Sequence, residues 1–134
     1  MTQAAARPGP AKKILIAEDE PNIVISLEFL LKEAGYEVAI ARDGSQALSL
    51  AGSLRPDLIV LDVMLPALNG FDVCRRIRGS REVKNTKVLM LTARGRDSEV
   101  ARGMAAGADA YMTKPFATRE LVKVVADLLG KSPE

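Results

Sequence analysis

Five polar side chains in this sequence together have the chemistry needed to handle a phosphoryl group. They are two adjacent carboxylates, a third carboxylate, a hydroxyl and an ammonium group: Glu18, Asp19, Asp62, Thr92 and Lys114. Crowded carboxylates repel one another, and a hard divalent cation with oxygen ligands relieves that repulsion, Mg²⁺ being the natural choice. Phosphoryl transfer needs little more than a nucleophilic oxygen, this cation, a positive charge and a hydrogen-bond donor.

Each of these residues also has an ordinary structural role as an alternative. A carboxylate after an apolar run is usually a turn or cap residue, and acidic residues at 18–20 suit the amino-terminal end of a helix. Thr92 alone could be a cap, and Lys114 a solvated lysine. The functional hypothesis therefore requires that the fold gather all of them at one place. In that case we predict Asp62 as the nucleophile, Lys114 as the charge clamp and Thr92 as the donor.

Short apolar runs precede these residues and have the character of buried strands. Five strands are expected, each followed by a helical pattern: Ile14–Ala17, Tyr36–Ala41, Leu58–Asp62, Thr86–Leu91 and Asp109–Thr113. Strict alternation with right-handed crossovers predicts an α/β fold, a (βα)5 doubly wound parallel sheet of five strands. The second run alternates apolar and polar residues as an edge strand does, which favours the order 2-1-3-4-5.

A parallel sheet brings the carboxyl-terminal ends of its strands to one edge, where open α/β sheets bind ligands. The residues that end strands 1, 3, 4 and 5 are the carboxylates, the hydroxyl and the lysine described above. The predicted topology therefore gathers the whole set, and the functional hypothesis is favoured over separate structural roles.

The helical patterns predict which side chains face the sheet. In the helix expected at about Ser98–Ala106, Val100 and Met104 should point inward, and Gly103 should weaken the helix. The helix before it should bury its apolar residues and present three arginines to solvent: Arg75, Arg76 and Arg78.

Composition sets further bounds on function. The 134 residues predict a single domain at 12–131, between a flexible lead-in at 1–11 and a tail at 132–134. The absence of His excludes an imidazole base, and the single Cys74 excludes an internal disulfide and predicts a reducing, cytoplasmic setting. No run approaches the ~18 apolar residues of a membrane span. A net charge of +2 gives no reason to expect direct nucleic acid binding.

Four motifs resemble, in order and spacing, the receiver domain of two-component response regulators, the CheY-like family with a flavodoxin-like fold. They are Ala17–Pro21, Pro56–Pro66, Leu91–Ala93 and Lys114–Phe116. The resemblance runs from about Lys12 to Gly130.

The resemblance implies that Asp62 accepts a phosphoryl group from a phosphohistidine on a sensor histidine kinase or phosphotransfer protein. Asp19, Asp62 and the backbone carbonyl of Met64 would bind Mg²⁺, and Glu18 would act through water. Many relatives have Asp where this chain has Glu18, and the longer side chain could alter the metal geometry. The protein would be a switch and not an enzyme, assisting only its own phosphorylation and slow dephosphorylation.

The resemblance also implies a coupled switch in which the Thr92 hydroxyl moves toward the phosphoryl group and the Tyr111 ring turns inward. The responding face would be the fourth helix, fifth strand and fifth helix, at about Gly95–Leu129, and would bind an unknown downstream protein. The Lys114–Pro115 peptide bond would be cis.

Met64 and Arg94 follow Asp62 and Thr92 by two residues, and neither orients an attacking water as an amide or carboxylate would. We therefore expect slow hydrolysis of the acyl phosphate, over many minutes or longer. On the responding face, Ala110 and Val124 replace charged residues that winged-helix regulators use to dimerise. This predicts a monomer or weak dimer.

Alternatives of other classes are weaker. A phosphohydrolase would carry its general acid at the position of Met64, and a flavin or nucleotide module would need a glycine-rich loop after the first strand. We expect a free-standing receiver, because only four residues follow the last helical pattern. The alternative is a receiver domain excised from a larger DNA-binding or output-domain regulator.

Overall fold

The computed structural model describes residues 11–93 and 97–130. Five strands alternate with five helices along this part of the chain, as predicted. Their bounds are β1 Lys13–Ala17, α2 Pro21–Glu33, β2 Glu37–Ala41, α3 Gly44–Leu54, β3 Leu58–Asp62, α4 Gly70–Arg78, β4 Lys87–Ala93, α5 Asp97–Ala106, β5 Ala110–Lys114 and α6 Thr118–Leu128. None of the described helices is both long enough and apolar enough to cross a bilayer.

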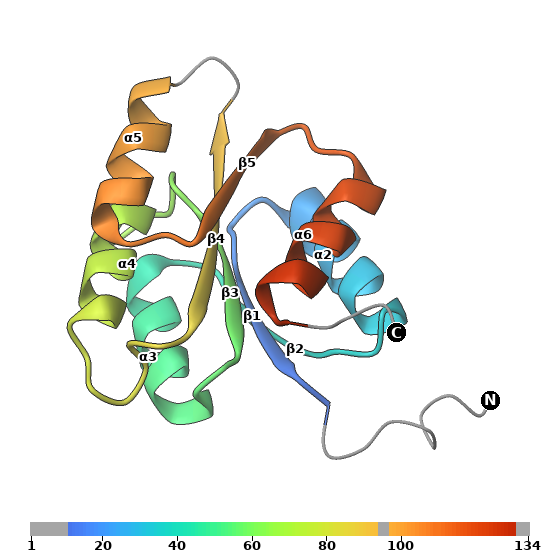
Figure 1. The fold of residues 1–134 in the computed structure, drawn as a ribbon, viewed down its shortest axis with the longest axis horizontal. Coiled ribbons are helices and arrows are strands. Elements are labelled where there is room, and N and C mark those ends of the chain that lie inside the picture. Colours follow the sequence, from blue (N-terminus) through green and yellow to red (C-terminus); the bar gives the residue numbers. More distant parts are fainter. Residues whose placement is uncertain (1–10, 94–96, 131–134) are drawn as a thin grey trace.

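The strands form one parallel sheet in the order β2-β1-β3-β4-β5, which confirms the predicted fold class and strand order. Helices α2 and α6 cover one face, and α3, α4 and α5 cover the other (Figure 1). Alternate residues of each inner strand belong to different cores. In β3, Leu58 and Val60 pack toward α2 and α6, whereas Ile59 and Leu61 pack toward the other three helices.

Strand β3 is buried along its whole length, because both faces of the sheet are covered. This is why its sequence is an uninterrupted aliphatic run and not an alternating one. Strand β2 lies at the edge and is only partly buried over most of its length, as its alternating sequence predicted. The most central strand therefore carries Asp62 on a rigid, well-packed support.

The helix ends follow their local sequences. Pro21 occupies the first turn of α2, and Gly35 follows that helix with a positive φ of 97°, which a glycine adopts without strain. The side chains of Asp43 and Asn69 accept hydrogen bonds from the backbone N–H groups of Gln46 and Asp72, at 2.7 and 3.0 Å. The second of these caps fixes the start of α4, directly after the loop that follows Asp62.

The predicted inward face of α5 was wrong in one respect. Met104 is exposed at 46%, and the small residues Gly103 and Ala106 face the sheet instead. A Cβ atom at Gly103 would lie only 2.8 Å from the Sδ atom of Met90 in β4. Gly103 is therefore a close-packing residue, in addition to any weakening of the helix. Helical spacing alone could not reveal that Gly103 faces the sheet, because a helical pattern is recognised by its large apolar side chains and glycine has none.

The predicted outward position of Arg78 was also wrong. Its side chain is only 24% exposed and turns back over the end of α4 to contact the connection between α5 and β5. Arg75 and Arg76 are exposed, as expected. The difference arises because an arginine has a long flexible stem, so its head group need not lie where its Cβ points.

Candidate functional site

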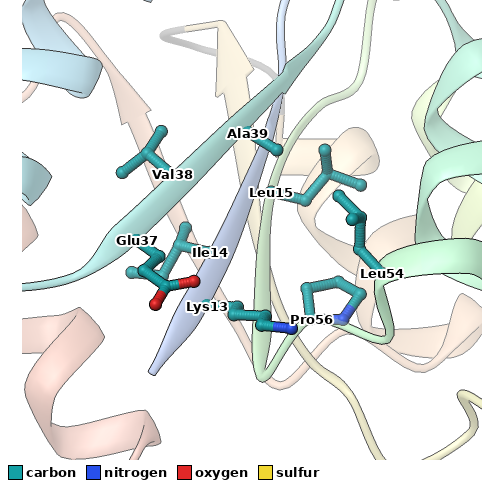
Figure 2. A pocket seen from close by; sticks show the side chains of 8 residues that line it. All are labelled: Lys13, Ile14, Leu15, Glu37, Val38, Ala39, Leu54 and Pro56. Atoms are coloured by element: carbon teal, nitrogen blue, oxygen red, sulfur yellow. The ribbon is translucent and has the colours of Figure 1, made fainter. Parts of the chain in front are cut away.

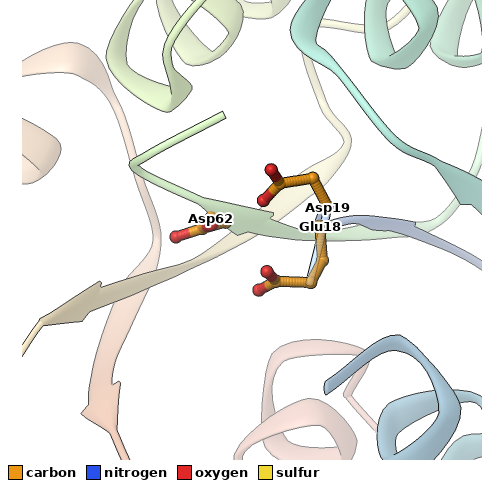
Figure 3. A group of neighbouring side chains, drawn as sticks. All are labelled: Glu18, Asp19 and Asp62. Carbon is orange, nitrogen blue, oxygen red and sulfur yellow. The ribbon is translucent and has the colours of Figure 1, made fainter. Parts of the chain in front are cut away.

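Three carboxylates gather at the carboxyl-terminal edge of the sheet. The register pairs Ala17 of β1 with Leu61 of β3, so the residues that follow, Glu18 and Asp62, are level with each other. Glu18, Asp19 and Asp62 each offer an oxygen, and these atoms lie within 4.8 Å of one another. Figure 3 shows Asp62 at the end of β3 beside Glu18 and Asp19, whose side chains point to opposite sides at the end of β1. The structure thus brings together the acidic residues that the sequence singled out.

Lys114 reaches the same place from the end of β5. Its Nζ atom lies 3.0 Å from Oε1 of Glu18 and 3.3 Å from Oδ1 of Asp62. The peptide bond that follows Lys114 is cis, as the resemblance implied. The predicted charge clamp is therefore placed directly against the predicted nucleophile.

Burial and charge shape the electrostatics of the site. Burial raises the pKa of Glu18, the Asp62 charge raises it further, and contact with Lys114 partly offsets both effects. Burial alone would lower the pKa of Lys114. Its close contact with the Glu18 carboxylate and the charge of Asp62 outweigh that effect, and the lysine pKa is raised. Lys114 therefore stays protonated beside the carboxylates.

A divalent cation fits this set of donors. Three carboxylates and one ammonium group leave two negative charges uncompensated. Glu18 is fully buried, and although its Oε1 atom contacts Lys114, it accepts no hydrogen bond of good geometry from the described residues. All the side-chain donors are hard oxygen atoms, which suit Mg²⁺. The residues present are thus those a magnesium site would need.

Thr92 lies at the end of β4 and is 1% exposed. Its Oγ1 atom has no hydrogen-bond partner among the described residues, which is uncommon for a buried hydroxyl. An oxygen-rich group arriving at Asp62 would supply an acceptor. Tyr111 in β5 is 46% exposed, so its ring is turned outward in this structure.

The loop after Asp62 makes close backbone contacts next to the site. The backbone N–H of Met64 donates to Oδ1 of Asp62 at 3.2 Å, and the N–H of Gly70 donates to the Val63 carbonyl at 2.9 Å. A Cβ at Gly70 would lie 2.5 Å from the Asp62 carbonyl oxygen. Met64 itself is 63% exposed. Arg94 lies outside the described residues.

Two contributors escaped the sequence analysis. Gly70 permits the loop to pass close to Asp62, and the sequence analysis assigned it no role. The backbone N–H of Glu20 donates to Oε2 of Glu18 at 3.1 Å and helps to orient that carboxylate. No sequence signal could have found this contact, because nearly every residue has a backbone N–H.

A separate hollow lies at the opposite edge of the sheet, between the starts of β1 and β2 and the end of α3 (Figure 2). It has a volume of about 220 Å³, and its lining includes Ile14, Leu15, Val38 and Leu54. None of the predicted site residues lines it. Its mainly aliphatic lining carries no arrangement of polar groups comparable to the one around Asp62.

Comparison with known proteins agrees with the site geometry. The family model described as the response regulator receiver domain matches residues 14–126. The chain belongs to this family. Receiver domains of two-component systems take their signals from histidine kinases, so this chain is a receiver module of a signalling pathway.

Individual relatives add detail. The alkaline phosphatase synthesis transcriptional regulatory protein PhoP of Bacillus subtilis is 46% identical over 121 residues, covering 90% of this chain and 50% of that protein. The DNA-binding response regulator MtrA of Mycolicibacterium smegmatis is 41% identical over 123 residues, covering 92% and 53%. The chain therefore spans about half the length of these curated relatives.

A solved structure bears on the metal site. The receiver domain of a sensor histidine kinase from Pseudomonas aeruginosa is 31% identical, with a TM-score of 0.84, and the match covers 90% of this chain and 99% of that one. It was solved with a magnesium ion coordinated in its active site cleft. The acidic cluster of this chain has the donors for such an ion.

Proposed function

We propose that Asp62 accepts a phosphoryl group in a Mg²⁺-dependent reaction and that this modification switches the binding properties of the domain. The observation that carries the proposal is the position of Asp62, with its Oδ1 atom 3.3 Å from Lys114 and an oxygen within 4.8 Å of Glu18 and Asp19. Asp19, Asp62 and the Met64 carbonyl would hold the cation, and Glu18 would act through water. The bound cation would supply positive charge to the phosphoryl oxygens.

The chain's own residues have distinct roles in this reaction. The Met64 N–H and Lys114 fix the rotation of the Asp62 carboxylate, so that one oxygen can attack phosphorus in line with the leaving group. Lys114 offsets the charge on the transferred group, and the unpartnered Thr92 hydroxyl donates to one of its oxygens. Met64 stands where a phosphohydrolase would need a general acid, which favours a switch over an enzyme that turns over substrate.

The proposed donor is a phosphohistidine on a sensor histidine kinase or phosphotransfer protein. A hollow of about 480 Å³ opens beside Lys114, between the start of α2 and the loop between β5 and α6. Two large apolar side chains of α2 are exposed, Ile25 at 65% and Phe29 at 64%. This surface would admit the donor imidazole and hold the protein that carries it.

The proposed output is a change in the face formed by α5, β5 and α6. Thr92 and Tyr111 would couple the site to this face, and a downstream protein would bind it. We infer a cytoplasmic location, since histidine kinases phosphorylate their receivers there. Both a single-domain protein and a receiver joined to an output domain accommodate these features.

The decisive experiment is incubation with acetyl phosphate and Mg²⁺ followed by intact mass measurement. We expect a gain of one phosphoryl group, lost on removal of Mg²⁺ and in Asp62→Asn. Asp57→Asn is the matched control, because Asp57 accepts a hydrogen bond from the Lys13 N–H at the opposite edge of the sheet. That variant should gain the group like the native protein. No adduct on the native protein would overturn the proposal.

A further inference from the structure

The carboxyl-terminal end of α5 is tied to the rest of the domain by Arg78. This side chain donates four hydrogen bonds from the end of α4. Nε donates to the Gly107 carbonyl at 2.8 Å, and Nη2 to Oδ2 of Asp109 at 2.6 Å. Nη1 donates to the carbonyls of Lys84 and Thr86, at 2.8 and 2.5 Å. One guanidinium group thus joins α4, the segment before β4 and the connection from α5 to β5.

The surroundings of Arg78 are built to receive it. Oδ2 of Asp109 also accepts the Val88 N–H of β4 at 2.8 Å, so the carboxylate is fixed from two sides. Gly107 has a φ of 105°, and a Cβ there would lie 2.7 Å from Cγ of Arg78. On the inner side, Sγ of the buried Cys74 donates to the Ala106 carbonyl at 3.4 Å. The last turn of α5 and the residues after it are therefore held on both sides.

The contact described near the middle of α5 is of a different kind. The Arg102 guanidinium lies over the Phe71 ring at 4.2 Å from its centre, a contact that can slide without breaking a directed hydrogen bond. The helix begins at Asp97, five residues after Thr92, whose buried hydroxyl has no partner among the described residues. Ten helical residues span roughly 15 Å, so the end of α5 that Arg78 contacts lies about that far from the end nearer Thr92 in the chain.

We propose that Arg78 is the positioning residue that fixes the carboxyl-terminal end of α5, so that phosphorylation displaces the amino-terminal half about that point. This inference rests on the proposed phosphorylation of Asp62. It specifies which end of α5 moves. A change at Thr92 acts on the end that begins at Asp97, and the Arg78 contacts at the other end prevent the helix from moving as a whole.

Hydrogen exchange with and without acetyl phosphate and Mg²⁺ tests this inference on the full chain. In the native protein we expect the phosphorylation-dependent change in exchange to lie in peptides covering 97–102, with residues 103–110 unchanged. In Arg78→Gln the change should spread into 103–110. After phosphorylation, exchange in these residues should be about tenfold faster than in the same variant before phosphorylation, as expected from losing a charged hydrogen bond. A role confined to stability would raise exchange equally with and without acetyl phosphate.

Arg75→Gln is the matched control, since Arg75 lies on the same helix and is exposed, and its side chain contacts Asp72 at 3.4 Å. It should behave like the native protein. Asp109→Asn is a milder second variant, because the amide oxygen can still accept the Val88 N–H. It should give a smaller change of the same kind, and it decides the question if Arg78→Gln does not fold.

Two results would overturn the inference. One is an even change in exchange along α5 in the native protein, and the other is that the phosphorylated Arg78 and Asp109 variants match Arg75→Gln. Failure of the native protein to gain a phosphoryl group would instead overturn the proposed function.

Discussion

The ammonium group of Lys114 lies 3.0 Å from Oε1 of Glu18, a carboxylate that is completely buried. The two residues are 96 positions apart, and the ends of β1 and β5 bring them together. Because burial and Asp62 raise the pKa of Glu18, its negative charge is unfavourable in the folded protein unless a cation compensates it. Lys114 supplies part of that compensation.

The Glu18 contribution to stability should therefore depend on pH. A carboxyl group with a raised pKa binds its proton more tightly in the folded state, so its contribution is present below the ordinary value of 4.5 and is lost as the pH rises through the folded-state pKa. We expect Glu18→Gln to gain stability relative to the native protein between pH 4.5 and pH 7.5, without divalent cations. Urea unfolding at the two pH values measures this. A stability difference that shrinks as pH rises would contradict the assignment.

Thr92 provides a test that separates folding from switching. We expect Thr92→Val to leave stability unchanged or to raise it by up to about 1 kcal/mol, because it replaces a buried hydroxyl without a described partner. Asp62 should still be phosphorylated, but the exchange change in α5 should be lost. The control is Thr113→Val, the exposed residue paired with Thr92 in the register, which should keep the response. A normal α5 response in phosphorylated Thr92→Val would exclude the predicted coupling.

Two glycines in helices should respond oppositely to alanine. Gly103→Ala should lower the free energy of unfolding by about 1–3 kcal/mol, because the added Cβ meets Sδ of buried Met90 at 2.8 Å. Gly52→Ala in α3 should raise it by up to about 1 kcal/mol, since nothing lies within 4 Å and alanine favours the helix. Thermal or urea unfolding compares the two variants directly. Stabilisation by Gly103→Ala would show that Met90 yields easily and that close packing does not explain the glycine.

The exposed side chain of Met64 should slow hydrolysis of the acyl phosphate. It follows Asp62 by two residues, is 63% exposed, and can neither orient nor activate water. We expect the phosphorylated protein to persist for many minutes or longer in Mg²⁺. Met64→Glu should shorten its lifetime by about tenfold, less than the roughly hundredfold or more that a fully positioned base contributes. Intact mass followed over time, after removal of acetyl phosphate, gives the rate. Met104→Glu, at an exposed methionine of α5, is the control, and seconds-scale decay of the native protein would refute the expectation.

Much of the site could be predicted from sequence because its residues end recognisable strands. The aliphatic run 58–61 is buried on both faces, so its composition alone indicates a central strand, and parallel topology then places Asp62 beside Glu18 and Asp19. The roles predicted for these residues remain predictions. Their gathering at one edge, however, follows from strand order and direction, which the strand and helix periods indicated.

The sequence by itself determined the alternation of strands and helices, the edge position of β2, and the residues available at the carboxyl-terminal edge. These features depend on local periodicity and on the direction of parallel strands. Only the tertiary structure decided how α5 sits on the sheet, with Gly103 inward and Met104 exposed, and where Arg78 reaches. Helix rotation depends on the depth of packing against a particular neighbour, here Met90. The reach of Arg78 depends on acceptors brought together by the fold, including Gly107 and Asp109, about thirty residues further along the chain.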